Sequence, residues 1–255
     1  MRCNCHLRYL LYCPAEGLSG KGNRGQRIKR ACKVKSLDEL HTFLLAVLLM
    51  LSVVPGGSSR FEEVRAALDG KGSCAEETGI LLLQSDGNWI AGNTVMGNSI
   101  GICLLDSNNN TVAENDLSKN REFGLFLERS CGSAIYRNDV YHNAFSGISL
   151  WDSAHNSLAY NKAGYNFENG ISLWNSSENM LLNNTASSNG LWGIYFSRSG
   201  KNYLRENNAS NNGENGLFLC DSDRNVLERN IAANNLGICG DICSYSSSMK
   251  LQSRL

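Results

Sequence analysis

The chain has 255 residues, with 24 basic residues, 24 acidic residues and four histidines, so its formal net charge is zero. Nothing in this balance provides the basic surface that binds a phosphate backbone, and we expect no nucleic acid as a partner. The charge is uneven along the chain, because residues 1–35 carry nine basic residues and one acid, Glu16.

The N-terminal region is predicted to consist of a basic, cysteine-containing leader, residues 1–42, and an apolar segment, residues 43–58. The apolar run FLLAVLLMLSVV has 12 residues, whereas a membrane-spanning helix needs ~20. A basic flank, an apolar core and small residues after it are typical of a signal peptide. We therefore expect an extracytoplasmic protein, whether secreted, periplasmic or on the cell surface. Contact with a membrane is expected only if residues 43–54 are retained as an anchor.

Residues 59–78 are predicted to form a capping helix and a linker. Ser59 and Glu62 have the spacing of a capping box, and Gly70 ends the pattern. One face of this helix would be apolar, through Phe61, Val64 and Leu68. Its expected role is to cover the first strand edge of the domain that follows.

A repeat of 23 residues fills residues 79–240. Each repeat begins with a glycine, counted here as position 1: Gly79, Gly101, Gly124, Gly147, Gly170, Gly193 and Gly216. The first two glycines are 22 residues apart, and each of the next five spacings is 23 residues. A regular period of this length indicates a solenoid, in which each repeat forms one coil.

Asparagine occupies fixed positions behind each glycine. Position 15 is always asparagine: Asn93, Asn115, Asn138, Asn161, Asn184, Asn207 and Asn230. Stacked asparagines can bond to each other from coil to coil, as in cross-β ladders, and asparagine tolerates the left-handed backbone of tight corners. We therefore predict a structural ladder at position 15, with its asparagines at the corners.

Apolar residues at positions 2, 4, 12 and 17 are equally regular, as Ile148, Leu150, Leu158 and Ala163 show in one repeat. A spacing of two places side chains on one face of a strand. The sequence therefore predicts an all-β fold, a single-stranded parallel β-helix of about seven to eight coils, followed by a C-terminal tail, residues 241–255. Because this tail is thin cover for the last coil, self-association through the coil end is a further expected contact.

The unit G-I-x-L-x-x-S-x-x-N-x-V-x-x-N-x-x-x-x-N, repeated over residues 79–238, resembles the right-handed parallel β-helix repeats of NosD-like proteins. The resemblance implies a right-handed β-helix. The wider group includes carbohydrate-binding proteins and sugar hydrolases, and NosD itself is described as a periplasmic copper-binding accessory protein. The matched residues are scaffold residues, so the resemblance specifies the fold more closely than the activity.

Positions 3 and 5 of the long strand are predicted to point outward and to form an apolar stripe. Its aromatic members are the candidate ligand-binding residues: Phe126, Trp151, Trp174 and Tyr195. Aromatic faces suit sugar rings, so polysaccharide or cell-surface glycan is the expected partner. An alternative stays open, in which the stripe packs under the leader, a loop or a second chain.

Acidic residues border this stripe, and three of them are candidate catalytic residues: Asp106, Glu128 and Asp152. Asp106 and Asp152 would lie two coils apart, ~9.6 Å, near the upper separation of the carboxyl pair in an inverting glycosidase. The alternative is a surface charge ladder of low energetic value, in which Arg129 pairs with its acidic neighbours.

We expect no metal site and no cofactor. After the apolar segment the chain has two histidines, His142 and His155, at different repeat positions, which is no cluster for a soft metal. Six cysteines also follow that segment, and an even number in a secreted protein suggests disulfides. Cys103 and Cys220 lie too many coils apart to pair with each other.

Taken together, the residues favour a non-catalytic binding or structural module outside the cytoplasm. Two alternatives remain: a carbohydrate-active enzyme, either a polysaccharide lyase or a glycosidase, and a NosD-like accessory factor of a periplasmic copper protein.

Overall fold

The computed structural model describes residues 77–237, 242–244 and 249–252. The predicted leader, the apolar segment and the capping helix up to residue 76 lie outside the described residues. All regular elements in the described part are strands. No helix within it is long and apolar enough to cross a membrane.

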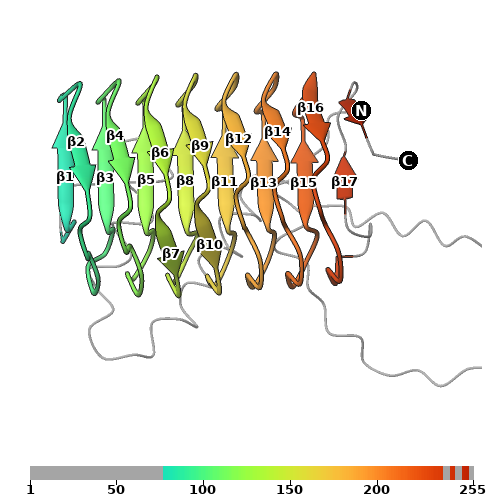
Figure 1. The fold of residues 1–255 in the computed structure, drawn as a ribbon, viewed down its shortest axis with the longest axis horizontal. Coiled ribbons are helices and arrows are strands. Elements are labelled where there is room, and N and C mark those ends of the chain that lie inside the picture. Colours follow the sequence, from blue (N-terminus) through green and yellow to red (C-terminus); the bar gives the residue numbers. More distant parts are fainter. Residues whose placement is uncertain (1–76, 238–241, 245–248, 253–255) are drawn as a thin grey trace, which may run out of the picture. The chain divides into compact units, whose positions relative to one another are not determined.

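Two eight-stranded parallel sheets run along the molecule, and each coil contributes one strand to each sheet (Figure 1). The first sheet, which carries the outward stripe, contains β1 (Ile80–Leu83), β3 (Ile102–Leu105), β5 (Leu125–Glu128), β8 (Ile148–Trp151), β11 (Ile171–Trp174), β13 (Ile194–Ser197), β15 (Leu217–Cys220) and β17 (Ile242–Ser244). The second contains β2 (Trp89–Ala91), β4 (Thr111–Ala113), β6 (Ala134–Tyr136), β9 (Ser157–Ala159), β12 (Met180–Leu182), β14 (Tyr203–Arg205), β16 (Asn225–Glu228) and β18 (Met249–Gln252). Strand order follows sequence order in both, as a solenoid requires.

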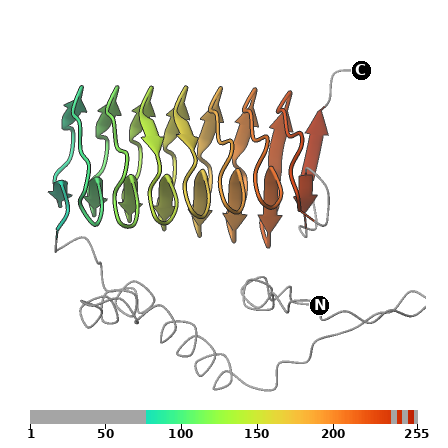
Figure 2. The same ribbon diagram turned by 90° about the horizontal axis from the view of Figure 1, so that it is seen from below.

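A third, shorter face is formed by β7 (Asp139–Tyr141) and β10 (Lys162–Gly164). Single parallel bridges extend this face in both directions, for example between Thr94 and Asp116 and between Thr185 and Asn208. Each coil therefore has three straight sides joined by corners, and Figure 2 shows the coils as successive loops. The predicted parallel β-helix is confirmed.

The register places equivalent residues of successive repeats side by side. Ile148 pairs with Ile171, and Trp151 pairs with Trp174. At the C-terminal end the structure continues the β-helix beyond residue 240, where the sequence prediction placed a tail. Phe218 pairs with Cys243, so this spacing is two residues longer than the 23-residue repeat. The longer spacing departs from the 23-residue period, so the strands of the eighth coil lie beyond the predicted boundary at residue 240.

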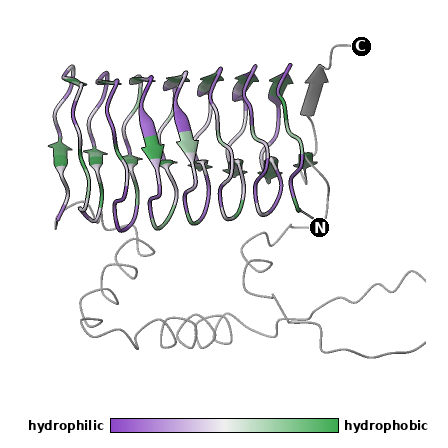
Figure 3. Ribbon diagram, turned by 60° about the horizontal axis from the view of Figure 1, so that its bottom comes forward, coloured by the Kyte–Doolittle hydropathy of each residue, from purple (hydrophilic) through white to green (hydrophobic). Residues whose placement is uncertain are grey.

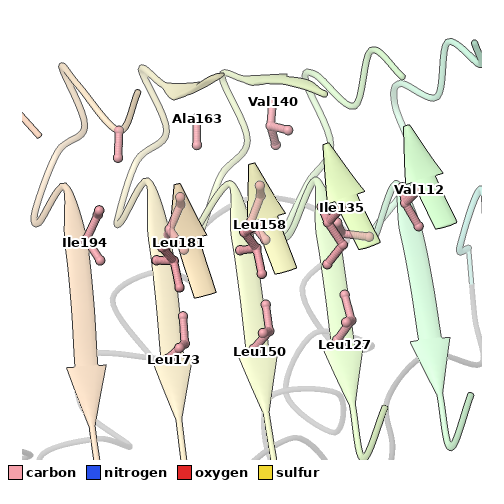
Figure 4. Packing of buried hydrophobic residues seen from close by; sticks show 14 of the residues in the cluster. Val112, Leu127, Ile135, Val140, Leu150, Leu158, Ala163, Leu173, Leu181 and Ile194 are labelled. Carbon is pink, nitrogen blue, oxygen red and sulfur yellow. The ribbon is translucent and has the colours of Figure 1, made fainter. Parts of the chain in front are cut away.

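The core lies inside the coils, where positions 2, 4, 12 and 17 stack into continuous apolar columns. Ile148, Leu150, Leu158 and Ala163 are completely buried. Figure 4 shows these columns meeting between the sheets, and Figure 3 shows hydrophilic residues concentrated in the turns. The predicted inward positions are confirmed.

The position-15 asparagine ladder forms along the whole described helix. The Nδ2 of Asn138 donates to the Oδ1 of Asn161 over 2.9 Å, and the Nδ2 of Asn161 donates to the Oδ1 of Asn184 over 3.0 Å. Each side chain also reaches backward to a backbone carbonyl, as Asn161 does to Ile135 over 2.9 Å. The ladder therefore satisfies backbone groups that the corners leave without a strand partner.

The corner geometry differs from the prediction in one respect. The ladder asparagines are not left-handed; the residue directly before each of them is, at position 14: Gly92, Glu114, Arg137, Tyr160, Asn183, Glu206 and Arg229. Most of these residue types are poor formers of this conformation. Their backbone is held by the buried amide beside them, so the ladder and not the corner residue determines the turn.

Candidate functional site

The outward stripe of the first sheet is largely covered. Phe126 and Tyr195 are 2% and 1% exposed, whereas Trp151 and Trp174 are half-buried. Only near the N-terminal end, at Leu81 and Leu83, is the stripe well exposed. The two tryptophans are therefore the members of the predicted ligand-binding set whose rings can meet a ligand without rearrangement.

Part of the cover comes from the repeat itself, from residues just before the position-1 glycine. Phe123 stacks on Phe126 with ring centroids 5.0 Å apart. Trp192 stacks on Tyr195 at 4.7 Å and on Phe218 at 4.9 Å. These residues were not predicted to belong to the site, because they lie outside the strands. The available signal was a bulky side chain directly before Gly124 and Gly193.

These contacts create an unbroken row of eight rings across five strands, from β5 to β15, which we call the aromatic row: Phe145, Phe123, Phe126, Trp151, Trp174, Tyr195, Trp192 and Phe218. Trp151 and Trp174 stand in its middle with centroids 6.3 Å apart. Contacts with Phe126 and with Tyr195 support them from either side. Rings fixed by such packing lose little freedom when a ligand binds.

Small polar side chains lie on the strands of the two tryptophans, β8 and β11, or two residues before them. The hydroxyls of Ser149 and Ser172 are 2.9 Å apart, and the Nδ2 of Asn169 donates to the Oγ of Ser146 over 3.1 Å. The indole N–H of Trp151 is buried and has no hydrogen-bond acceptor among the described residues. A buried donor without an acceptor is costly, and a ligand oxygen could relieve this cost.

The three candidate catalytic residues lie on neighbouring coils, at or just after the ends of β3, β5 and β8, and each of them is bound to another side chain. The Nε of Arg129 donates to Asp106 over 2.7 Å, and the same guanidinium contacts the carboxylate of Glu128. The hydrogen bond from Arg129 lowers the pKa of Asp106, whereas burial raises the pKa of Glu128. Asp152 accepts a hydrogen bond from the side-chain amide of Asn175.

A second acidic column, not predicted from the sequence, lies before the first-sheet strands at position 22. Glu122, Glu168 and Glu214 alternate there with Phe145 and Leu191, and backbone hydrogen bonds join successive members. The available signal in the sequence was a glutamate at position 22 of every second repeat. This pattern has a period of two coils, so it does not appear when single repeats are compared.

Glu168 is half-buried, and burial raises its pKa from 4.5 to about 7. The folded protein therefore holds this proton more tightly than the unfolded chain does. Its contribution to stability is most favourable below the unfolded pKa and is lost as the pH rises through the folded pKa. We expect Glu168→Gln to match the wild type at about pH 4 and to be more stable by about 2 kcal/mol at pH 8, which is less than the full pKa shift would give because water still reaches this half-buried carboxyl. Urea unfolding at both pH values measures this difference, and an equal gain at both values would contradict the assignment.

The fold and this site define a class: a parallel β-helix protein with an aromatic row on the outer face of one sheet. The profile of the family described as "Periplasmic copper-binding protein (NosD)" matches residues 63–179 and 146–252, so the chain belongs to the NosD family. No curated protein sequence matches the chain.

Solved β-helix structures resemble the chain in fold. The periplasmic alginate epimerase AlgG is 24% identical, with a TM-score of 0.54 over 74% of this chain and 53% of that chain. The Dettilon tailspike protein is 15% identical, with a TM-score of 0.56 over 71% of this chain and 44% of that chain. The chain thus spans about half the length of these structures, and at such identities the likeness concerns the fold alone.

The family description implies copper, and the described residues do not fit it. No group of three or more histidine, cysteine or acidic side chains is arranged to hold a metal ion in the part of the chain that the structure describes. The two histidines there have other neighbours: His142 stacks on Tyr165 at 5.4 Å, and the Nδ1 of His155 lies 3.6 Å from Glu178. Copper sites require clustered soft or imidazole ligands, which these positions do not supply.

Proposed function

We propose that this protein is a non-catalytic polysaccharide-binding module that acts outside the cytoplasm, through Trp151 and Trp174. The observation that carries the proposal is the pair of half-buried indoles in the middle of the aromatic row, held by rings on both sides. A sugar ring presents apolar C–H faces that stack on such surfaces, while its hydroxyls need nearby polar groups. The buried N–H of Trp151 and the serines beside it are groups of this kind.

The extracytoplasmic location has three supports. The family description names the periplasm, and residues 43–58 have the composition of a signal peptide. Cys103 and Cys220 are each disulfide-bonded, and disulfides persist mainly in oxidising compartments.

A binding role fits the acidic residues better than a catalytic one does. Arg129 engages Asp106 and Glu128 at once, so neither carboxyl is positioned to exchange a proton with a substrate. The epimerase named above acts on alginate, but its likeness to this chain covers scaffold residues. We therefore place the specificity of the protein in the aromatic row and its flanks.

A glycan array probed with the full chain, followed by product analysis of every hit, tests the proposal. We expect Trp174→Ala to weaken binding to a hit by about 30-fold, because truncating a central aromatic contact costs about 2 kcal/mol. Trp89→Ala is the matched control, since Trp89 lies on the second sheet and is 69% exposed. Equal loss in both variants would contradict the assignment, and a cleaved product would overturn the non-catalytic role and direct attention to Asp152.

A further inference from the structure

Two columns of carboxyl groups lie on either side of Trp151 and Trp174, the two central members of the aromatic row. One is the position-22 column, which lies before the first-sheet strands. The other follows the ends of these strands, at positions 5 and 6. Together the two columns hold seven acids and two basic residues: Asp106, Glu122, Glu128, Asp152, Glu168, Glu214 and Asp221 with Arg129 and Arg198.

The carboxyl groups of the position-22 column have fewer basic partners than those of the other column. The carboxyl groups of Glu168 and Glu214 have no hydrogen bond or ion pair with any described residue. Burial raises the pKa of both. A buried carboxyl without a partner gains more from a nearby cation than an exposed one does, because less water screens the attraction.

The acids and the tryptophans lie on the same outer face. Glu168 lies two residues before Gly170, which leads into β11. The side chain of Ser172 lies on the outer side of that strand, and Trp174 ends it. Across the strand axis, Asp152 follows Trp151 at the end of β8. A glycan stacked on the two tryptophans would therefore run between the carboxyl columns.

We propose that the glycan bound by the aromatic row is a cationic amino-sugar polymer, selected by the carboxyl columns on either side. This inference rests on the proposed polysaccharide-binding function and specifies its ligand class. Opposite charges across an interface increase the rate of association and exclude partners of the wrong charge. An anionic polysaccharide would meet seven carboxyl groups and two guanidinium groups, and one of the latter, that of Arg129, is already paired with Asp106 and Glu128.

The surroundings of the acids favour an extended cation over a bound metal ion. Successive glutamates of the position-22 column are separated by Phe145 or Leu191 and stand two coils apart, ~9.6 Å. No metal-binding group of three such side chains occurs in the described ranges. A polymer that carries an amine on each sugar can meet carboxyl groups at this spacing, whereas a single ion cannot.

Isothermal titration of the full chain with three oligosaccharides of equal length tests the inference at about pH 7 and low salt, where the carboxyl of Glu168, with a pKa of about 7, is partly ionised and the amines of glucosamine keep part of their charge. The probes are a glucosamine hexamer, which is cationic, its N-acetylated counterpart, which is neutral, and an alginate hexamer, which is anionic. We expect the glucosamine hexamer to bind about 10-fold more tightly than the neutral one, and we expect this preference to shrink as salt is added. Alginate should not bind.

A double variant, Glu168→Gln with Glu214→Gln, should reduce the preference for the cationic hexamer to about 2-fold and leave affinity for the neutral hexamer unchanged. The control is Glu114→Gln, a carboxyl on a corner of the second sheet that is paired with Arg137. Equal affinity for the cationic and neutral hexamers, a preference for alginate, or an unchanged preference in the double variant would overturn the charge inference and leave glycan binding intact. Failure of every probe together with an empty glycan array would overturn both.

Discussion

Replacing Asn161 by alanine is expected to lower the free energy of unfolding by about 4 kcal/mol. Asn161 is completely buried in the middle of the position-15 ladder. Its Nδ2 donates to the carbonyl of Ile135 over 2.9 Å and to the Oδ1 of Asn184 over 3.0 Å. Its Oδ1 accepts from the backbone N–H of Asn138 over 3.1 Å and from the Nδ2 of Asn138 over 2.9 Å.

The effect is large because alanine removes four hydrogen bonds and leaves backbone groups without partners inside the protein. A lost hydrogen bond costs ~1 kcal/mol, and an orphaned buried group costs ~1–3 kcal/mol. The coil cannot admit water to these groups without separating from its neighbours. We therefore expect the whole β-helix to unfold cooperatively at a lower temperature, without a separate transition for the coil that carries the substitution.

Thermal and urea unfolding of Asn161→Ala measure the loss, and Asn211→Gly provides the control. Asn211 is exposed at a left-handed corner position, where its backbone needs no amide side chain. The control should change stability by less than about 1 kcal/mol. A similar loss in both variants would contradict the ladder as the source of the effect.

The second large effect is expected for Gly170→Ala, which should destabilise the protein by about 3 kcal/mol or prevent folding. A Cβ at Gly170 would lie 2.7 Å from the Nδ2 of Asn189 and 2.8 Å from both the Cβ of Ala186 and the carbonyl oxygen of Gly193. Asn189 is at position 20, where a second column of asparagines bonds from coil to coil, as Asn189 does with Asn166 and Asn212. Neither this amide nor the backbone carbonyl can move without breaking the stack.

Gly92→Asn is the matched control for Gly170→Ala. Gly92 has a φ of 67°, a Cβ added there would meet no heavy atom within 4 Å, and asparagine tolerates this conformation. We expect near-wild-type stability for the control, as judged by the midpoint of urea unfolding. If Gly170→Ala unfolded at the same urea concentration as the control, the close packing at position 1 would be disproved.

The position-1 glycines illustrate what sequence reasoning could and could not supply. Their period predicted the fold, and the apolar columns that include Ile148 and Leu158 predicted the core. Both predictions were strong because the same pattern occurs in each of the seven repeats. The physical reason for the glycine became visible only in the structure. None of the seven has a positive φ; the position is glycine because an adjacent coil occupies the space of a Cβ.

The functional face was harder to predict, because its properties arise between coils. The sequence identified Trp151 and Trp174 as outward residues. It did not show that Phe123 and Trp192 would fold over Phe126 and Tyr195. The acidic column was hidden for a similar reason, since neighbours in space are 23 residues apart in sequence and Glu168 alternates with apolar residues.

The spacing of the coils also bears on how such a protein changes over generations. The first repeat is one residue shorter than the others, and the spacing from Phe218 to Cys243 is two residues longer, yet strand register is kept on both sides. Each coil is aligned by bonds to its neighbours and not by the length of chain that connects them. A block of 23 residues could therefore be duplicated or deleted while the neighbouring coils still align with each other. Unequal recombination would then change the length of the binding face and leave the side chains of every remaining coil as they were.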